Sequence, residues 1–255
     1  MPNDSMTIRS GAARAAMLIS LASLAACRIG PAAQQADTGS STSAMSTPNS
    51  LTAAERAEGW RLLFDGRSMD AWRGYREQAM PAGWRAEDGV LTKSTPTNDI
   101  VTRDEFGDFD LRFEWKLGTG GNAGVFYRAT EEYDKVYWSS TEYQLLDDPN
   151  APDGRNPLTS AGAAYGFYPA PRGVVKPAGE WNTSRIVVRG KHVEHWLNGQ
   201  KIVEYEFGSP DWQQRVQNSK FRQWPEDGKA ARGHIGLQEH GSRVAFRNIK
   251  IRELR

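Results

Sequence analysis

The chain has 255 residues and a formal net charge of +1 at pH 7, with nine tryptophans, eight tyrosines, 25 glycines and one cysteine. Surfaces that bind phosphate backbones carry a strong excess of Lys and Arg, so this balance argues against nucleic acid as a partner. The lone cysteine, Cys27, excludes an intrachain disulfide and a cysteine-based zinc site.

The N-terminal segment has the composition of a secretion signal. Two arginines precede the apolar stretch 15–26, which is too short to span a membrane. The stretch ends in Leu24-Ala25-Ala26-Cys27, which resembles the bacterial lipobox, where the cysteine is lipidated and becomes the mature N-terminus. We therefore expect residues 1–27 to be a lipoprotein signal peptide, and the lipid on Cys27 to be the only attachment to a membrane. Arg28, rather than Asp, follows the cysteine, which favours the outer membrane with the domain facing the periplasm.

The rest of the chain divides into a linker and one domain. Residues 28–54 are rich in Ala, Ser, Thr, Gln and Pro and lack apolar periodicity, so they are predicted to be a disordered tether. From residue 55 to residue 255, aromatic and aliphatic side chains recur without a fixed repeat or a second linker. This pattern predicts a single domain over 55–255.

Alternation of apolar and polar residues predicts β-strands through most of this domain. In 109–117 every second residue is apolar, which is typical of a strand with one wet face. Asn198-Gly199 separates two such segments, 192–197 and 200–207, and predicts a hairpin with a type I′ turn. Further short strands are expected at 125–128, 141–146, 185–189, 235–238 and 244–251.

A helical period is weak throughout, and only short helical pieces are expected, at 55–58 and 210–216. Many short strands with glycine-rich turns and no alternation of strand and helix predict an all-β antiparallel sandwich. The outer face of a large curved sheet is concave. Polar side chains that point outward from neighbouring strands therefore converge there and are the first candidates for a site.

The strongest constellation of this kind is Glu142-x-Gln144-x-x-Asp147. Glu142 and Gln144 share one face of the predicted strand, while Tyr143 and Leu145 point to the other face. A carboxylate beside an amide, with a second carboxylate nearby, can move protons, bind sugar hydroxyls or hold a hard cation. A turn-forming role for Asp147 is an equal alternative.

Three other side chains are candidates for contact with a substrate. Asn122 lies in the glycine-rich segment 120–124, where the backbone can approach a ligand closely. Arg128 could clamp a substrate oxygen or pair with Glu142. Trp181 precedes a strand and could stack on a sugar ring, with a structural role as the alternative.

The segment 233–241 supplies the candidate proton carrier. Ile235 and Leu237 face the core, whereas His234, Gln238 and His240 share the opposite face. A histidine near its ordinary pKa is the usual proton mover at neutral pH, and His240 stands at a strand end beside Gln238. We therefore expect His240 to be catalytic and Gln238 to contact the substrate.

An ordered series of motifs from residue 59 to residue 254 resembles a known family. The series comprises Gly59-Trp60-x-x-Leu63-Phe64-Asp65-Gly66 with Trp72, Trp84, Asp88-Gly89-Val90-Leu91, the strand 109–115, Gly121-Asn122-Ala123-Gly124 with Arg128, Glu142-Tyr143-Gln144-Leu145-Leu146-Asp147, Ala164-Tyr165-Gly166, Gly179-Glu180-Trp181-Asn182, Trp196-Leu197-Asn198-Gly199, Gly236-Leu237-Gln238-x-His240-Gly241 and Phe246-Arg247-Asn248-Ile249. It is similar to the 3-keto-disaccharide hydrolase family, also described as 3-keto-glucoside 1,2-lyase and 3-keto-2-hydroxyglucal hydratase. Two departures stand out: Ala123 occupies a usual Ser position, and Ser140 and Thr141 occupy a usual Gly-Tyr pair.

The resemblance implies a jelly-roll sandwich of the concanavalin A-like lectin and glucanase type, and cleavage of oxidised, 3-keto sugars. Elimination next to a ketone needs a base, an acid and an electrophile for the enolate. The implied acid and base are Glu142 and His240, and a divalent cation held by Glu142 and Asp147 could polarise the ketone. The implied contacts to the enolate or to sugar hydroxyls are Asn122, Arg128, Gln144 and Gln238.

Two other functions fit the same fold class. A laminarinase-type glycoside hydrolase would use strand carboxylates as nucleophile and acid, although Gln144 stands where a carboxylate is wanted. A lectin-like module would bind sugar without turnover. Fold alone does not choose among the three functions.

Overall fold

The computed structural model describes residues 47–224 and 228–255. Within these two ranges no helix has both the length and the apolar character needed to cross a membrane. Cys27 and the tether up to residue 46 lie outside the described residues. The signal peptide and the lipidation site therefore stay predictions.

The domain begins earlier than predicted, because residues 47–54 belong to it rather than to a disordered tether. The side-chain amide of Asn49 donates to the carbonyl of Gly89 (2.7 Å), and its oxygen accepts from the backbone of Asn248 (2.8 Å). Thr52 caps α1 (Ala53–Ala57) and forms a capping box with Glu55. These contacts tie the segment to the end of the chain, which composition alone does not reveal.

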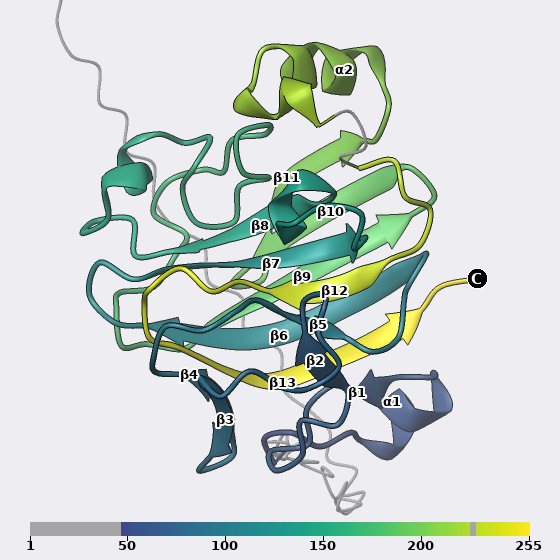
Figure 1. Cartoon of the computed structure of the whole chain (residues 1–255), viewed down its shortest axis with the longest axis vertical. Helices are drawn as coiled ribbons and strands as arrows, with labels where there is room; N and C mark the ends of the chain where they lie inside the picture. The colour runs from purple at the N-terminus through teal and green to yellow at the C-terminus, as the bar shows by residue number, and fades with distance from the viewer. Residues whose placement is uncertain (1–46, 225–227) are drawn as a thin grey trace, which may run out of the picture. The chain divides into compact units, whose positions relative to one another are not determined.

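The first of two antiparallel sheets contains eight strands (Figure 1). Its order is β11 (Gln200–Glu206), β10 (His192–Leu197), β9 (Asn182–Arg189), β6 (Phe109–Leu117), β13 (Val244–Glu253), β4 (Val90–Lys93) and β3 (Trp84–Glu87), with β1 (Arg61–Leu62) paired to β13. The β10–β11 hairpin turns through Asn198 and Gly199, whose φ angles of 49° and 84° are those of the predicted type I′ turn.

The second sheet contains five strands, also antiparallel. Its order is β2 (Trp72–Gly74), β5 (Ile100–Thr102), β12 (His234–Leu237), β7 (Asn122–Ala129) and β8 (Thr141–Leu146). The predicted all-β sandwich of antiparallel sheets is confirmed. The short strands β1 to β5 were not predicted.

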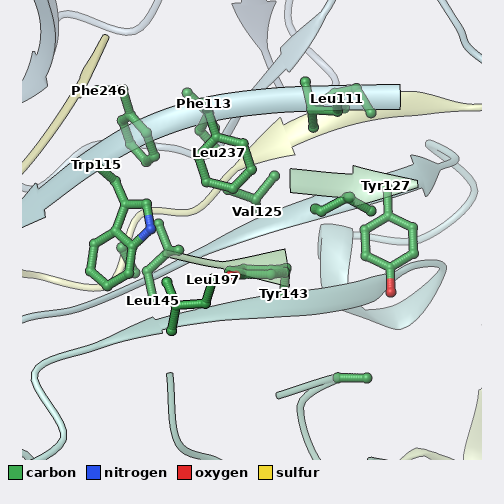
Figure 2. Close-up of a cluster of buried hydrophobic side chains, with 14 of the residues drawn as sticks. Leu111, Phe113, Trp115, Val125, Tyr127, Tyr143, Leu145, Leu197, Leu237 and Phe246 are labelled. Atoms are coloured by element: carbon green, nitrogen blue, oxygen red, sulfur yellow. The ribbon is translucent and has the colours of Figure 1, made fainter. Parts of the chain in front are cut away.

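The two sheets pack face to face around one apolar core (Figure 2). Phe113 of β6 meets Tyr143 of β8 edge to face, with ring centroids 5.8 Å apart. Each buried side chain of this size contributes about 1.5–3 kcal/mol to folding. Ser184 satisfies the polar atoms of two core rings, because it bonds the Trp115 indole (2.8 Å) and the Tyr143 hydroxyl (2.9 Å).

Short helical segments complete the fold. They are α2 (Pro210–Gln217), which was predicted, and the 3₁₀ segments η1 (Val136–Trp138), η2 (Pro152–Arg155) and η3 (Lys220–Gln223). The rings of Trp138 and Trp224 stack with centroids 4.9 Å apart, so η1 and η3 are held beside each other. This pairing matters for the site, since both segments border the outer face of the second sheet.

Candidate active site

A cavity of about 640 Å³ lies on the outer face of the second sheet. Five residues named by sequence reasoning line it together: Asn122, Glu142, Gln144, Gln238 and His240. They come from β7, β8 and the end of β12, which are neighbours in the sheet. The expectation that separated strands bring an acid and an imidazole to one hollow is therefore met in the structure.

Strand alternation and strand register determine which residues form the floor of this cavity. Tyr143 and Leu145 are in the core, so Glu142 and Gln144 point to the opposite face. Gly124 pairs with Gln144 on one side and accepts a backbone bond from Gln238 (2.9 Å) on the other. The bare glycine thus lies between two glutamines, at the centre of the floor.

The carboxyl group of Glu142 lies directly over Gly124. A Cβ atom on Gly124 would come within 2.3 Å of Glu142 Oε1, which no side chain could tolerate without movement. Gln238 supplies a side-chain hydrogen bond to the carboxyl. Burial raises the pKa of Glu142 to about 8, and the positive charge of Lys220 offsets only part of that effect. The group is consequently protonated at neutral pH and able to donate a proton.

Three amide oxygens in the cavity lack an intramolecular partner among the described residues: Asn122 Oδ1, Gln144 Oε1 and Gln238 Oε1. They are more than half of the five buried side-chain atoms without a partner in that part of the chain. An unsatisfied buried polar atom costs about 1–3 kcal/mol. The cavity lining is therefore where most of the unsatisfied hydrogen-bond acceptors of the described residues gather.

Asp99 is a second carboxyl group in the cavity, and sequence reasoning missed it. It directly precedes β5, and its Oδ1 accepts from the backbone N–H of Glu239 (2.6 Å). Burial raises the pKa of Asp99 to about 6; the Glu239 N–H and the positive charges of Lys135 and His240 act in the opposite direction. An aspartate before a three-residue strand has no recognisable motif, so only the structure shows its position.

His240 lies at the mouth of the cavity, on a loop that hydrogen bonds and an ion pair of Glu239 hold in place. The neighbouring Glu239 carboxylate accepts from the N–H of Gly241 (2.6 Å) and from the ammonium group of Lys93 (2.6 Å). Lys93 is 1% exposed, so this ion pair anchors the loop to the protein interior. The imidazole itself is exposed and can exchange protons with solvent.

Arg128, predicted to contact the substrate, does not line the cavity. Its guanidinium donates to the carbonyl of Gly107 (3.0 Å) and to Asp108 (3.0 Å). The cause is a bulge: β12 pairs with both Phe126 and Ala129, so β7 has one residue more than its partner there. Arg128 is in the bulge with a φ of 53°, and its side chain is turned away from the site.

Trp181 and Asp147 are also placed outside the cavity. The Trp181 ring packs beneath the guanidinium of Arg247, 4.1 Å from the ring centroid, beside the first sheet. Asp147 Oδ2 accepts from the N–H of Gly120 (2.7 Å) and from Asn150 (2.9 Å), which is the turn-forming alternative. The structure therefore does not bring Trp181 or Asp147 into the cavity, and sugar stacking by Trp181 and cation binding by Asp147 stay predictions.

The structure does not bring Glu142 and Asp147 together as a pair of cation ligands. Among the described residues, one group of three His or carboxylate side chains has ligand atoms close enough to share an ion: His192, Glu194 and Glu204 of the hairpin. Lys201 already bonds Glu204 there (2.7 Å). This group belongs to the first sheet and not to the cavity.

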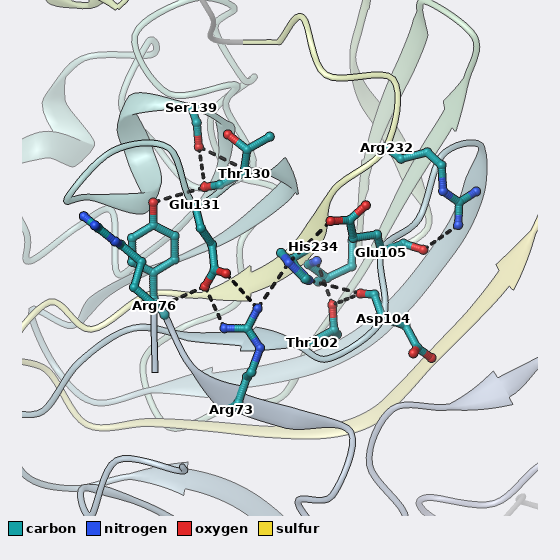
Figure 3. Close-up of polar contacts among 12 residues, drawn as sticks. Arg73, Arg76, Thr102, Asp104, Glu105, Thr130, Glu131, Ser139, Arg232 and His234 are labelled. Carbon is teal, nitrogen blue, oxygen red and sulfur yellow. Dashed lines mark hydrogen bonds and ion pairs between the residues drawn. The ribbon is translucent and has the colours of Figure 1, made fainter. Parts of the chain in front are cut away.

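His234 is buried in a polar network rather than in the cavity (Figure 3). Its Nε2 lies 3.3 Å from the guanidinium of Arg73, which forms two bonds to Glu131 (2.6 and 2.9 Å). Glu131 also accepts from the backbone of Arg76 (2.6 Å). Since Arg76 and its neighbour Tyr75 line the cavity, the network supports one wall of the site.

The family model described as 3-keto-alpha-glucoside-1,2-lyase-like domain matches residues 59–252. A 3-keto-disaccharide hydrolase of Bacteroides thetaiotaomicron is 34% identical over 251 residues, covering 83% of this chain and 87% of the relative. The chain belongs to the 3-keto-disaccharide hydrolase family.

Solved structures agree with this family membership. A Parabacteroides distasonis protein described as a glycosyl hydrolase is 36% identical, with a TM-score of 0.78, covering 82% of this chain and all of that one. A second from the same organism is 31% identical with a TM-score of 0.59, covering 76% of this chain and 99% of that one.

The two departures from the usual motifs of the 3-keto-disaccharide hydrolase family lie away from the cavity lining. Ala123 is 1% exposed and packs in the core between the sheets. The Ser140 hydroxyl donates to the carbonyl of Val136 (2.7 Å), and Thr141 is buried at the start of β8. These substitutions therefore leave the cavity side chains unchanged.

Proposed function

We propose that this protein is a carbohydrate-active enzyme that cleaves 3-keto-glycosides by proton abstraction and elimination, followed by hydration. The net result is hydrolysis of the glycosidic bond. The observation that carries the proposal is a buried carboxyl group, Glu142, that lines one cavity together with three side-chain amides and an imidazole at its mouth. Burial raises the pKa of Glu142 to about 8, which suits a proton donor. Membership of the 3-keto-disaccharide hydrolase family supports an oxidised sugar as the substrate.

The proposed reaction uses the acidity that a ketone gives to the neighbouring C–H bond. A base removes the proton beside the ketone at the third carbon, and the electron pair moves onto the ketone oxygen as an enolate. The electrons then return to expel the glycosidic oxygen from the adjacent carbon, which requires an acid. Water finally adds across the double bond that elimination leaves.

Each proton transfer has a group in the cavity. Glu142, with its pKa of about 8, gives its proton to the departing glycosidic oxygen. His240 takes the proton from carbon and passes it to solvent at the cavity mouth. Asp99, ionised at neutral pH with a pKa of about 6, stabilises the imidazolium that forms, since the two charges interact.

The amide groups bind the sugar. A sugar ring offers several hydroxyl donors, and Asn122, Gln144 and Gln238 each have an acceptor oxygen without a partner in the described part of the protein. The volume of about 640 Å³ falls within the roughly 300–1,000 Å³ of small-molecule sites. This is enough for a disaccharide-sized molecule with its reactive carbons near the floor.

Gly124→Ala should reduce kcat by about 10²-fold, because misplacing a catalytic group by about an ångström has that effect. The added Cβ would occupy the space of the Glu142 carboxyl. The φ angle of Gly124 is outside the left-handed region, so alanine adds no backbone strain. Steady-state kinetics and thermal unfolding measure the two effects separately. Gly118→Ala is the matched control, since its Cβ would meet open space; equal kinetics in both variants would contradict the placement of Glu142.

One observation favours an ordinary glycoside hydrolase as the second function. Glu142 and Asp99 are two carboxyl groups whose environments separate their pKa values, to about 8 and about 6. Glycosidases use such a pair as acid and base on unoxidised sugars. The lectin-like alternative needs only the amide oxygens and no proton transfer.

A comparison of oxidised and unoxidised glycosides tests the proposal. Purified full chain is incubated with a 3-keto-glucoside and with the matching glucoside, with and without chelator, and products are followed by NMR. We expect an unsaturated keto sugar and then free sugar from the keto compound alone. Cleavage of the plain glucoside would favour the glycosidase, and binding without turnover would favour the lectin. Loss of turnover in the presence of chelator would mean that a divalent cation polarises the ketone.

We also propose that the enzyme acts at the outer membrane, facing the periplasm, attached through lipid on Cys27. The sequence Leu24-Ala25-Ala26-Cys27 supports this proposal. Metabolic labelling with a fatty acid, compared between wild type and Cys27→Ala, tests the attachment.

A further inference from the structure

The proposed elimination needs a positive group beside the enolate oxygen, and the residue expected from sequence does not provide it. Arg128 is bonded to Gly107 and Asp108, outside the cavity. The side-chain amides of Asn122, Gln144 and Gln238 are neutral groups, with an acceptor oxygen as well as N–H donors, so they bring no positive charge to an enolate. Three Lys and Arg side chains do line the cavity: Arg76, Lys135 and Lys220.

We propose that Lys220 is the catalytic cation that stabilises the enolate oxygen, an inference that rests on the proposed function. Lys220 lines the cavity. Its ammonium group lies 4.6 Å from the ring centroid of Tyr165 and 5.0 Å from that of Phe221. Both rings also line the cavity, so cation–π contacts hold the flexible lysine against the cavity wall.

The backbone beneath Lys220 is fixed. Ser219 caps η3 by accepting from the N–H of Phe221 (3.1 Å). The Phe221 ring is 4% exposed and packs on Phe167 with centroids 5.0 Å apart. The Trp138–Trp224 stack joins the end of this segment to η1. These contacts therefore fix the backbone that carries Lys220, while its side chain is exposed.

The charge of Lys220 is available to a substrate. Among the described residues no carboxylate lies within ion-pair distance of its ammonium group, whereas Arg76, on the same cavity, is paired with Asp134. Lys135 acts on Asp99 instead. Lys220 and Glu142 line the same cavity, and the positive charge of Lys220 is the largest favourable charge effect on the pKa of Glu142.

The charges balance in the resulting step. The C–H bond beside the ketone breaks, and its proton goes to His240. The electron pair forms the carbon–carbon double bond, and the ketone oxygen becomes an oxyanion against the Lys220 ammonium. The oxyanion electrons then return to re-form the ketone, and the carbon–carbon double bond shifts to the carbon that carries the glycosidic oxygen. The glycosidic bond breaks, its electrons leave with the oxygen, and that oxygen takes the proton of Glu142. Lys220 transfers no proton in this step and acts by charge alone.

Replacement of Lys220 tests this role through the partial reaction that makes the enolate. In heavy water, NMR measures both deuterium uptake at the carbon beside the ketone and elimination. Lys220→Met should reduce the two rates together by about 10²-fold or more, the usual effect of removing one oxyanion partner. Lys220→Arg keeps the charge and should restore most of both rates. Lys201→Met, which removes an exposed ion pair on β11, is the control.

The outcomes separate failure of this inference from failure of the proposed function. If wild type does not act on the 3-keto-glucoside, the proposed function fails. If wild type acts and Lys220→Met retains deuterium uptake, Lys220 is not the enolate cation. If Lys220→Met loses activity but Lys220→Arg does so equally, with both variants folded by thermal unfolding, the role of charge is refuted.

Discussion

Glu142→Gln should reduce the elimination rate by about 10²- to 10⁴-fold, the usual contribution of a positioned proton donor. The amide keeps the size of the side chain but has no proton to give to the glycosidic oxygen. Enolate formation does not need that proton, so deuterium uptake beside the ketone should continue. This split distinguishes Glu142 from Lys220 and His240, and NMR in heavy water measures it. Loss of both rates would mean that Glu142 is the base.

The pH profile of wild type follows from the same group. Burial raises the pKa of Glu142 to about 8, and the proposed reaction uses the protonated form. The elimination rate should therefore fall as pH rises through about 8. A rate that stays level well above this pH would contradict a protonated Glu142 as the acid.

Urea unfolding checks that the Glu142→Gln variant is folded. Because the pKa of Glu142 is raised, the folded protein holds its proton more tightly than the unfolded chain does. The free energy of unfolding of wild type therefore falls as pH rises from the ordinary pKa of a glutamate to about 8. Glutamine does not titrate, so the Glu142→Gln variant lacks this pH-dependent loss. The advantage of Glu142→Gln in urea unfolding should grow over that range. An advantage independent of pH would argue against the buried carboxyl.

His240→Ala should reduce both deuterium uptake and elimination by about 10²- to 10⁴-fold, because both require removal of the carbon-bound proton. The site is at the cavity mouth, and the imidazole is exposed. Added imidazole should therefore enter the space left by the side chain and restore part of the rate.

His192→Ala is the matched control for this prediction. His192 is a surface histidine of the β10–β11 hairpin, beside Glu206 (2.7 Å), and it does not line the cavity. Its replacement should leave both rates unchanged. Full activity in His240→Ala would overturn the assignment of His240 as the base and leave Asp99 as the next candidate for that role.

The alternation of apolar and polar residues was enough to predict the longer β-strands. Alternation in β6 and β8 separates Phe113 and Tyr143, which face the core, from Glu142 and Gln144, which face the cavity. The hairpin at Asn198-Gly199 is equally local, since the turn needs two positive φ angles that these residues tolerate. Five of the cavity residues could be named in this way.

Other parts of the site depend on how the strands pair. Asp99 and Lys220 are 121 positions apart in the chain, and neither is in a motif; the cavity brings them together. The prediction that Arg128 contacts the substrate was not met, because one extra residue in β7 turns its side chain away from the expected face of the sheet. Side-chain direction alternates at every residue and is readable from neighbours, whereas bulges and cross-strand register arise only when distant strands pair. Composition and alternation therefore decide which face of a strand is polar, and tertiary pairing decides which polar groups meet.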